Sequence, residues 1–111
     1  MQPDIEKILE KVVERLVLAA QPEEIILFGS QTRGPARPES DLDLLVIESE
    51  PFGPLRSRLK EIGRLERALG EIPTATDLLV YSREEVERFR DSKNHVVGRA
   101  FREGEVLYVR S

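Results

Sequence analysis

The sequence predicts an α/β or α+β domain, a sheet with helices covering at least one of its faces. Short apolar runs bounded by glycine or proline are typical of strands, and longer segments carry apolar residues at the spacing of amphipathic helices. The strand-like runs cover residues 25–28, 41–47, 74–81 and 105–110. Helical segments precede the first run and separate the later ones, which indicates strands and helices packed in layers.

Length and composition restrict the possible functions. The 111 residues are expected to form a single domain, 1–111, with one modest core. No apolar run approaches the roughly 18 residues of a membrane span, and the first residues do not resemble a signal peptide. We therefore expect a cytoplasmic location without membrane contact. The formal net charge of −4 argues against direct nucleic-acid binding.

Any metal in this protein must be held by oxygen atoms. The chain has no cysteine, which excludes disulfides, thiolate zinc sites and a cysteine nucleophile. Its one histidine, His95, has no histidine or cysteine to share a metal with. We interpret His95 as a helix-surface residue.

The first helix is predicted over residues 4–20, where Pro3 and Asp4 suit the first turn and Pro22 stops the helix. Its apolar stripe consists of Ile5, Ile8, Leu9, Val12, Val13, Leu16 and Val17. The strand 25–28 follows and is bounded by Gly29. Glycines and prolines then predict a loop over residues 30–40.

The second helix follows the strand 41–47, with Pro54 suited to its first position and Gly70 to its end. Its predicted core stripe is Leu55, Leu59, Ile62, Leu65 and Leu69. The same segment carries a basic cluster of Arg56, Arg58, Lys60, Arg64 and Arg67. We interpret this cluster as a solvated helix face, or as a patch for a nucleotide's phosphates or an acidic partner.

A capping box follows the third strand: Ser82 is the expected cap and Glu85 reaches back to it. The helical pattern beyond it runs to Gly104 in one or two pieces. Residues 105–110 form the last predicted strand.

Two aspartates interrupt the apolar strand 41–47. Because residues two apart point to the same face, Asp41 and Asp43 share one face with Leu45 and Ile47, and the other face carries Leu42, Leu44 and Val46. The Cα atoms of the two aspartates are then roughly 6 to 7 Å apart. Like charges on one face repel, so a cation between them is expected, and magnesium prefers such oxygen ligands. Asp77, inside the third strand, joins the cluster if that strand is adjacent. Three aspartates on two strands can hold two magnesium ions in a clamp for phosphoryl displacement.

The end of the preceding strand supplies a possible phosphate site. Gly29 allows close approach of a phosphate to the backbone, and turn N–H groups with the Ser30 hydroxyl form an anion-binding nest. Arg33, in the following loop, could neutralise a phosphate.

This joint pattern resembles the signature of the DNA polymerase β-like nucleotidyltransferase superfamily. The residues that carry the resemblance are "FGS" at positions 28–30, ten residues, and "DLDL" at positions 41–44. The stretches "GSQTRG" and "SDLDLLV" resemble in particular the minimal nucleotidyltransferases (MNT type), over nearly the whole chain. The resemblance implies a small mixed sheet covered by helices. It also implies transfer of a nucleoside monophosphate from an NTP to a hydroxyl, releasing pyrophosphate.

The resemblance assigns roles to individual residues. The implied ligands of the two magnesium ions are Asp41, Asp43 and Asp77, of which Asp77 would also help deprotonate the acceptor hydroxyl. The implied nucleotide-binding residues are Gly29, Ser30 and Arg33.

The resemblance also implies a partner. MNT-type proteins are commonly the antitoxin of a pair with a HEPN-domain toxin, and they adenylylate a tyrosine hydroxyl of the toxin or simply bind it. ATP is then the expected donor. Larger relatives carry further domains for the acceptor, so we expect a partner protein or a second copy, as in a homo-oligomer, to complete this chain. The candidate contacts are the basic helix 56–67 and the C-terminal segment.

Two alternatives remain open. The chain could be a binding-only antitoxin with a vestigial site, or the catalytic subunit of a small-molecule nucleotidyltransferase that a separate helical subunit completes. The presence of all three aspartates with the Gly-Ser pair favours an enzyme, since an unpaired carboxylate cluster is costly to keep.

Overall fold

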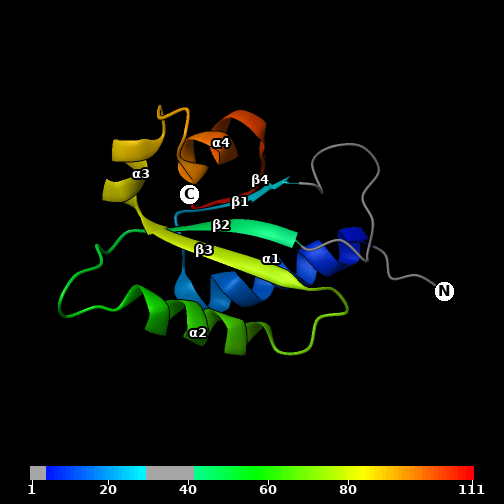
Figure 1. The fold of residues 1–111 in the computed structure, drawn as a ribbon. Coiled ribbons are helices and arrows are strands. Elements are labelled where there is room, and N and C mark those ends of the chain that lie inside the picture. The colour runs from blue at the N-terminus through cyan, green and yellow to red at the C-terminus, as the bar shows by residue number, and fades with distance from the viewer. Residues whose placement is uncertain (1–4, 30–41) are drawn as a thin grey trace.

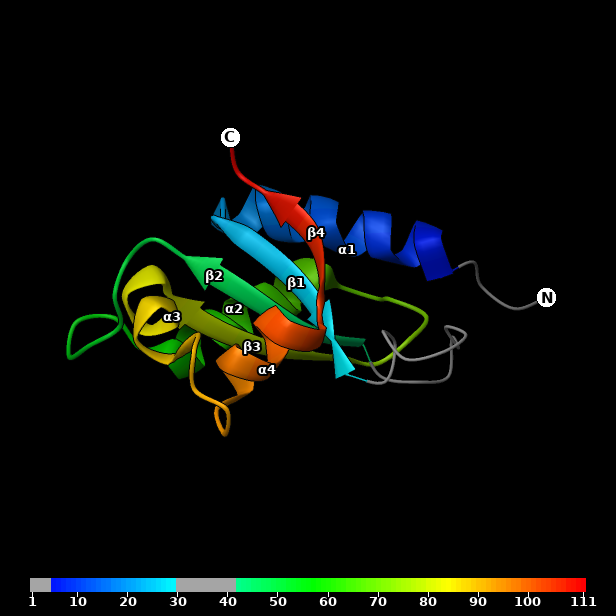
Figure 2. The same cartoon turned by 90° about the horizontal axis from the view of Figure 1, so that it is seen from above.

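A computed structural model describes residues 5–29 and 42–111 and contains one four-stranded sheet with helices on both faces (Figure 1, Figure 2). The elements are α1 (Ile5–Ala20), β1 (Glu24–Phe28), β2 (Leu42–Glu48), α2 (Arg58–Leu69), β3 (Thr76–Ser82), α3 (Arg83–Phe89), α4 (Val96–Glu103) and β4 (Glu105–Val109). The strand order is β3-β2-β1-β4; β2 and β3 are parallel, and β1 is antiparallel to both β2 and β4. The predicted fold class, a small mixed sheet covered by helices, is confirmed.

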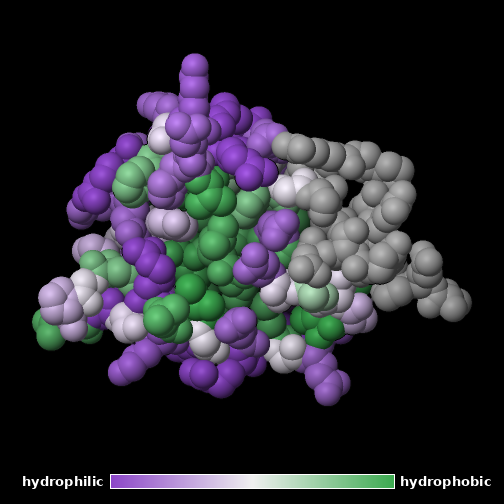
Figure 3. All heavy atoms as spheres, viewed as in Figure 1, coloured by the Kyte–Doolittle hydropathy of each residue, from purple (hydrophilic) through white to green (hydrophobic). Residues whose placement is uncertain are grey.

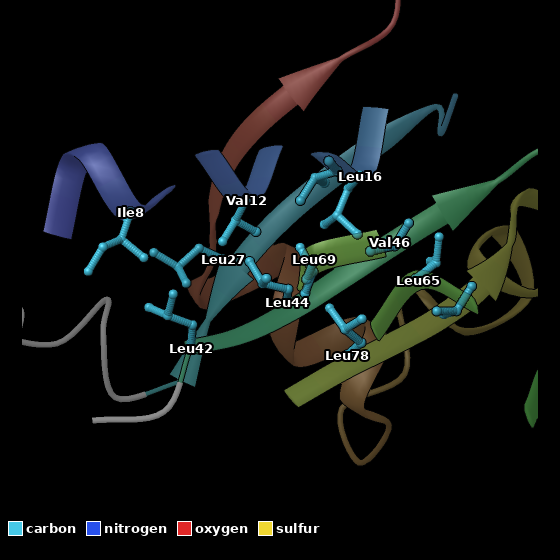
Figure 4. Packing of buried hydrophobic residues seen from close by; sticks show 12 residues of the cluster. Ile8, Val12, Leu16, Leu27, Leu42, Leu44, Val46, Leu65, Leu69 and Leu78 are labelled. Atoms are coloured by element: carbon cyan, nitrogen blue, oxygen red, sulfur yellow. The ribbon is translucent and has the colours of Figure 1, made fainter. Parts of the chain in front are cut away.

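The two faces of the sheet bury separate apolar clusters. Helices α1 and α2 pack on one face, where Leu16 and Leu65 meet Leu44 and Val46 of β2 (Figure 4). Helices α3 and α4 pack on the other face, against Leu45 and its neighbours. Because β2 alternates between the clusters, the predicted division of this strand into two faces is confirmed. Polar side chains cover the outer surfaces of the helices, and apolar side chains gather between them (Figure 3).

The start of α2 differs from the prediction. The helix begins at Arg58, where Ser57 caps it by accepting a hydrogen bond of 3.3 Å from the Lys60 N–H, and it does not begin at Pro54. A turn precedes it, in which the backbones of Gly53 and Arg56 exchange two hydrogen bonds of 3.1 Å.

The late start also corrects the core stripe that was predicted for this helix. Leu55 lies in the turn and is fully exposed, and Leu59 is 80% exposed in the first helical turn. Their assignment to the core was wrong, whereas Leu65 and Leu69 are buried.

The helical pattern after β3 forms two helices, and the capping box at the start of α3 is confirmed. The Ser82 N–H donates to the Glu85 carboxylate over 2.9 Å, and the Glu85 N–H donates to Ser82 Oγ over 3.2 Å. His95 caps α4: its Nδ1 accepts from the Val97 N–H, and its ring stacks on Phe89 with centroids 4.1 Å apart. None of the helices in the described ranges is long and apolar enough to cross a membrane.

Candidate active site

Asp43 and Asp77 lie side by side on neighbouring strands. The parallel pairing of β2 and β3 makes them partners in register, and adjacent strands lie roughly 4.8 Å apart. Both aspartates are on the α3–α4 face, because the residues two positions further along each strand, Leu45 and Leu79, belong to the cluster on that face. Asp43 is half-buried and Asp77 is exposed. Two carboxylates therefore share one accessible edge of this face.

Gly29 contacts the Asp43 carboxylate at the end of β1. Phe28 is the register partner of Asp43, so the next residue of the chain lies beside that side chain. A Cβ atom at position 29 would lie 2.3 Å from Oδ2 of Asp43, and the backbone here has a φ of +84°. Only glycine adopts this conformation readily and leaves the carboxylate where it is. The glycine that the sequence suggested as a phosphate contact is thus also a neighbour of a proposed metal ligand.

The other residues predicted for the site are Ser30, Arg33 and Asp41, and they lie outside the described residues. Within the described ranges, no three metal-ligating side chains gather in one place. The structure therefore brings together three of the six predicted residues: Gly29, Asp43 and Asp77.

The pair of carboxylates has the chemistry of a magnesium site. Two negative charges side by side on one face repel each other, and a divalent cation between them removes that penalty. Magnesium typically takes one or two protein carboxylates and fills its remaining positions with water and substrate phosphates. Asp43 and Asp77 fit that ligand set.

The basic cluster of α2 makes contacts within the chain. Arg56, just before the helix, donates to the Glu48 carboxylate of β2, and Arg64 donates to the Ala19 carbonyl at the end of α1 over 2.7 Å. Arg58 pairs with Glu85 and also donates to a β3 carbonyl over 2.7 Å. Three of the five cations thus join elements of the fold, which agrees better with a structural role than with a phosphate patch.

A buried acidic pair that was not predicted from the sequence lies at the other end of β2. Glu48 is 3% exposed and Glu61 is 8% exposed, beside a polar cavity of about 360 Å³. Burial and the neighbouring Glu61 raise the pKa of Glu48 to about 7, whereas hydrogen bonds from Arg64 lower the pKa of Glu61 to about 2. The parity of β2 was an available signal, because Glu48 has the same parity as Leu44 and Val46, whose side chains face α1 and α2.

The chain matches a known protein family over most of its length. Residues 5–76, more than half of the chain, match the family described as "Nucleotidyltransferase domain". The chain belongs to this nucleotidyltransferase domain family. Among curated proteins, no match is found.

Solved structures have the same fold. A protein from Sulfolobus solfataricus assigned as a nucleotidyltransferase superposes with a TM-score of 0.63 at 19% identity, over 94% of this chain and 79% of that one. A toxin–antitoxin structure with AMP-PNP gives a TM-score of 0.57 at 20% identity, and a mutant of the toxin–antitoxin MntA-HpeT gives 0.59 at 18%. Each of the latter two covers 93% of this chain and 74% of the other. At these identities the likeness concerns the fold alone.

Proposed function

We propose that this chain is a magnesium-dependent nucleotidyltransferase that moves AMP from ATP to a hydroxyl group of a partner protein. We further propose that it acts as an antitoxin whose acceptor is a HEPN-domain toxin. The observation that carries the proposal is the pairing that makes Asp43 and Asp77 register partners on one face of the sheet. Membership of the nucleotidyltransferase domain family supports the reaction class.

The metal would be held by the carboxylate oxygens of Asp43 and Asp77, with Asp41 as the third proposed ligand. When bound, magnesium supplies positive charge against the triphosphate and the leaving pyrophosphate. Gly29 keeps the space beside the Asp43 carboxylate free of a side chain. Ser30 and Arg33 are the proposed contacts of the triphosphate.

The exposed carboxylate of Asp77 would accept the proton of the acceptor hydroxyl. The acceptor oxygen then bonds to the α-phosphorus, and the bond from this phosphorus to the oxygen that bridges to the β-phosphate breaks. AMP is thereby esterified to the acceptor and pyrophosphate leaves with the electron pair of the broken bond. ATP is the preferred donor because one neighbour of the same fold was solved with AMP-PNP.

A label-transfer experiment tests the proposal. The purified chain is incubated with magnesium, each α-phosphate-labelled NTP in turn, and lysate of its source. The comparison uses Asp43→Asn, Asp77→Asn and a matched control, Asp91→Asn, whose exposed aspartate lies between α3 and α4. We expect one labelled protein band with ATP, lost in the first two variants and with EDTA, and retained in the control.

Two other outcomes contradict the proposal in different ways. No label with any NTP, together with a stable complex with a partner, indicates a binding-only antitoxin. A labelled small molecule in place of a protein band indicates the catalytic subunit of a small-molecule nucleotidyltransferase.

A further inference from the structure

A second surface, on the other face of the sheet from the aspartates, forms an open groove of about 490 Å³. Its described lining residues belong to α1 and β4. In the described sheet, β4 is the outermost strand on the β1 side, and α1 runs beside it (Figure 2). The aspartates lie on β2 and β3, on the opposite face of the sheet. The groove therefore opens on the other face from the proposed transfer site, and binding there does not require nucleotidyl transfer.

The base of the groove is apolar. Leu9 and Val13 of α1 and Leu107 of β4 line it, and all three side chains are partly buried against the main core. Leu9 and Val13 are four residues apart, so they form a stripe roughly 6 Å long on one side of α1. Such a stripe offers side-chain-sized contacts to a facing helix.

The rim of the groove is acidic. The other described residues that line it are Glu6, Glu10, Glu14 and Glu105, and none of the described lining residues is a lysine or arginine. Within the described part of the chain, Glu10, Glu14 and Glu105 make no ion pair or side-chain hydrogen bond, although Lys7 and Lys11 are on the same helix. Glutamates elsewhere in the chain do form ion pairs: Glu23, Glu24 and Glu85 each pair with an arginine.

The edge of β4 is poorly suited to adding a further strand. Ile25 pairs with Tyr108 and Ile26 pairs with Val106, so Leu107 is an extra residue that interrupts the ladder between them. A bulge of this kind bends and twists an edge strand, which opposes regular pairing with another strand. The groove thus favours a partner that inserts side chains.

We propose that this groove binds an amphipathic, basic helix of a partner protein. Apolar side chains of that helix pack on Leu9, Val13 and Leu107, and its lysines or arginines pair with the rim glutamates. Helices that bind in grooves use apolar residues at i, i+3, i+4 and i+7 in this manner. The same carboxylates repel nucleic acid and anionic lipid surfaces, which leaves a protein segment as the occupant.

Three synthetic peptides of equal length test the groove by NMR with the ¹⁵N-labelled full chain. The first alternates leucine and lysine at helical spacing, the second replaces lysine with glutamate, and the third replaces leucine with serine. We expect only the Leu/Lys peptide to bind and to shift the amide resonances of Leu9, Val13 and Leu107.

Matched variants then test the rim. We expect Glu10→Gln/Glu14→Gln to weaken binding of the Leu/Lys peptide about 3- to 10-fold. The control Glu66→Gln/Glu71→Gln changes two exposed glutamates on and just after α2 and should alter the Kd less than about 2-fold. The proposal is overturned by failure of the Leu/Lys peptide to bind, by shifts elsewhere on the chain, or by equal binding of either other peptide. Equal weakening in both double variants overturns it as well.

Discussion

The Asp43 carboxylate occupies the space that a side chain at Gly29 would need. A Cβ atom at residue 29 would lie 2.3 Å from Asp43 Oδ2 and 3.1 Å from its Cγ. The carboxylate is the end of a side chain that can rotate, so a larger residue at position 29 would displace it. The backbone conformation of one residue thus sets the position of a proposed metal ligand on the neighbouring strand.

Gly29→Ala is therefore expected to reduce transfer activity more than it reduces stability. Alanine at a φ of +84° costs roughly 1 to 3 kcal/mol of folding free energy, and its Cβ displaces the Asp43 carboxylate. We expect at least a 100-fold loss of turnover in a protein that still folds, measured by AMP transfer beside urea unfolding. Gly53→Ala is the control, since nothing lies within 4 Å of a Cβ atom there. Turnover near that of the unaltered chain in Gly29→Ala would show that the contact has no functional role.

Asp77→Asn is expected to leave the metal-free protein at least as stable as the unaltered chain. The substitution removes one of two like charges that are register partners on neighbouring strands, which is worth up to about 1 kcal/mol. Millimolar magnesium should then raise the Tm of the unaltered chain but not that of the variant, because binding to the folded state alone stabilises it. The measurement is thermal unfolding in EDTA and in magnesium, with Asp91→Asn as control. An equal magnesium shift in all three proteins contradicts the assignment of Asp77 as a ligand.

Much of the fold could be predicted because its strands and helices are locally encoded. The period of two in β2 separates Leu44 and Val46 from Leu45, and the structure buries the two sets on opposite faces. The start of α2 was missed because two local rules compete. Proline favours the first helical position, which predicted a start at Pro54. In the structure Ser57 caps the helix, and Pro54 lies before it, in the turn that the Gly53 and Arg56 backbones close.

The candidate site depends on contacts that are distant in sequence. Sequence spacing placed Asp43 on one face with Leu45. The register that makes Asp77 the partner of Asp43 is set only by the parallel pairing of β2 with β3. Asp77 is exposed, whereas Leu78 and Val80 of the same strand are buried. The contact of Gly29 with Asp43 likewise requires the antiparallel pairing of β1 and β2. Strand order and register were thus the missing information.

Leu16→Ala is expected to destabilise the fold strongly. Leu16 is fully buried between α1 and the sheet, and removing a buried leucine side chain typically costs about 2 to 5 kcal/mol (Figure 4). Leu18→Ala, two residues further along the same helix, is the control because Leu18 is 76% exposed and should change stability by less than about 0.5 kcal/mol. Urea unfolding measures both. Similar losses in the two variants would mean that α1 does not pack as described.

The stability of the protein is expected to fall between about pH 4.5 and pH 7 because of Glu48. Burial raises its pKa from 4.5 to about 7, so the folded chain keeps this proton over a range in which the unfolded chain loses it. Folding therefore weakens as the pH rises through this interval and then becomes constant. Glu61 acts in the opposite direction and in a lower range: its pKa of about 2 contributes stability above pH 4.5 that is lost as the pH falls toward 2.

Glu48→Gln isolates the contribution of this residue. The amide is neutral at every pH, and its oxygen can still accept the hydrogen bond that Arg56 gives to Glu48. We expect the variant to lose the decline between about pH 4.5 and pH 7 and to be more stable than the unaltered chain at pH 8, by about 1 to 3 kcal/mol. Glu50→Gln alters a carboxylate that also contacts Arg56 but is 79% exposed, so its pH profile should match that of the unaltered chain. Urea unfolding at each pH measures the stability of all three proteins. If the decline persists in Glu48→Gln, the proton belongs to another group.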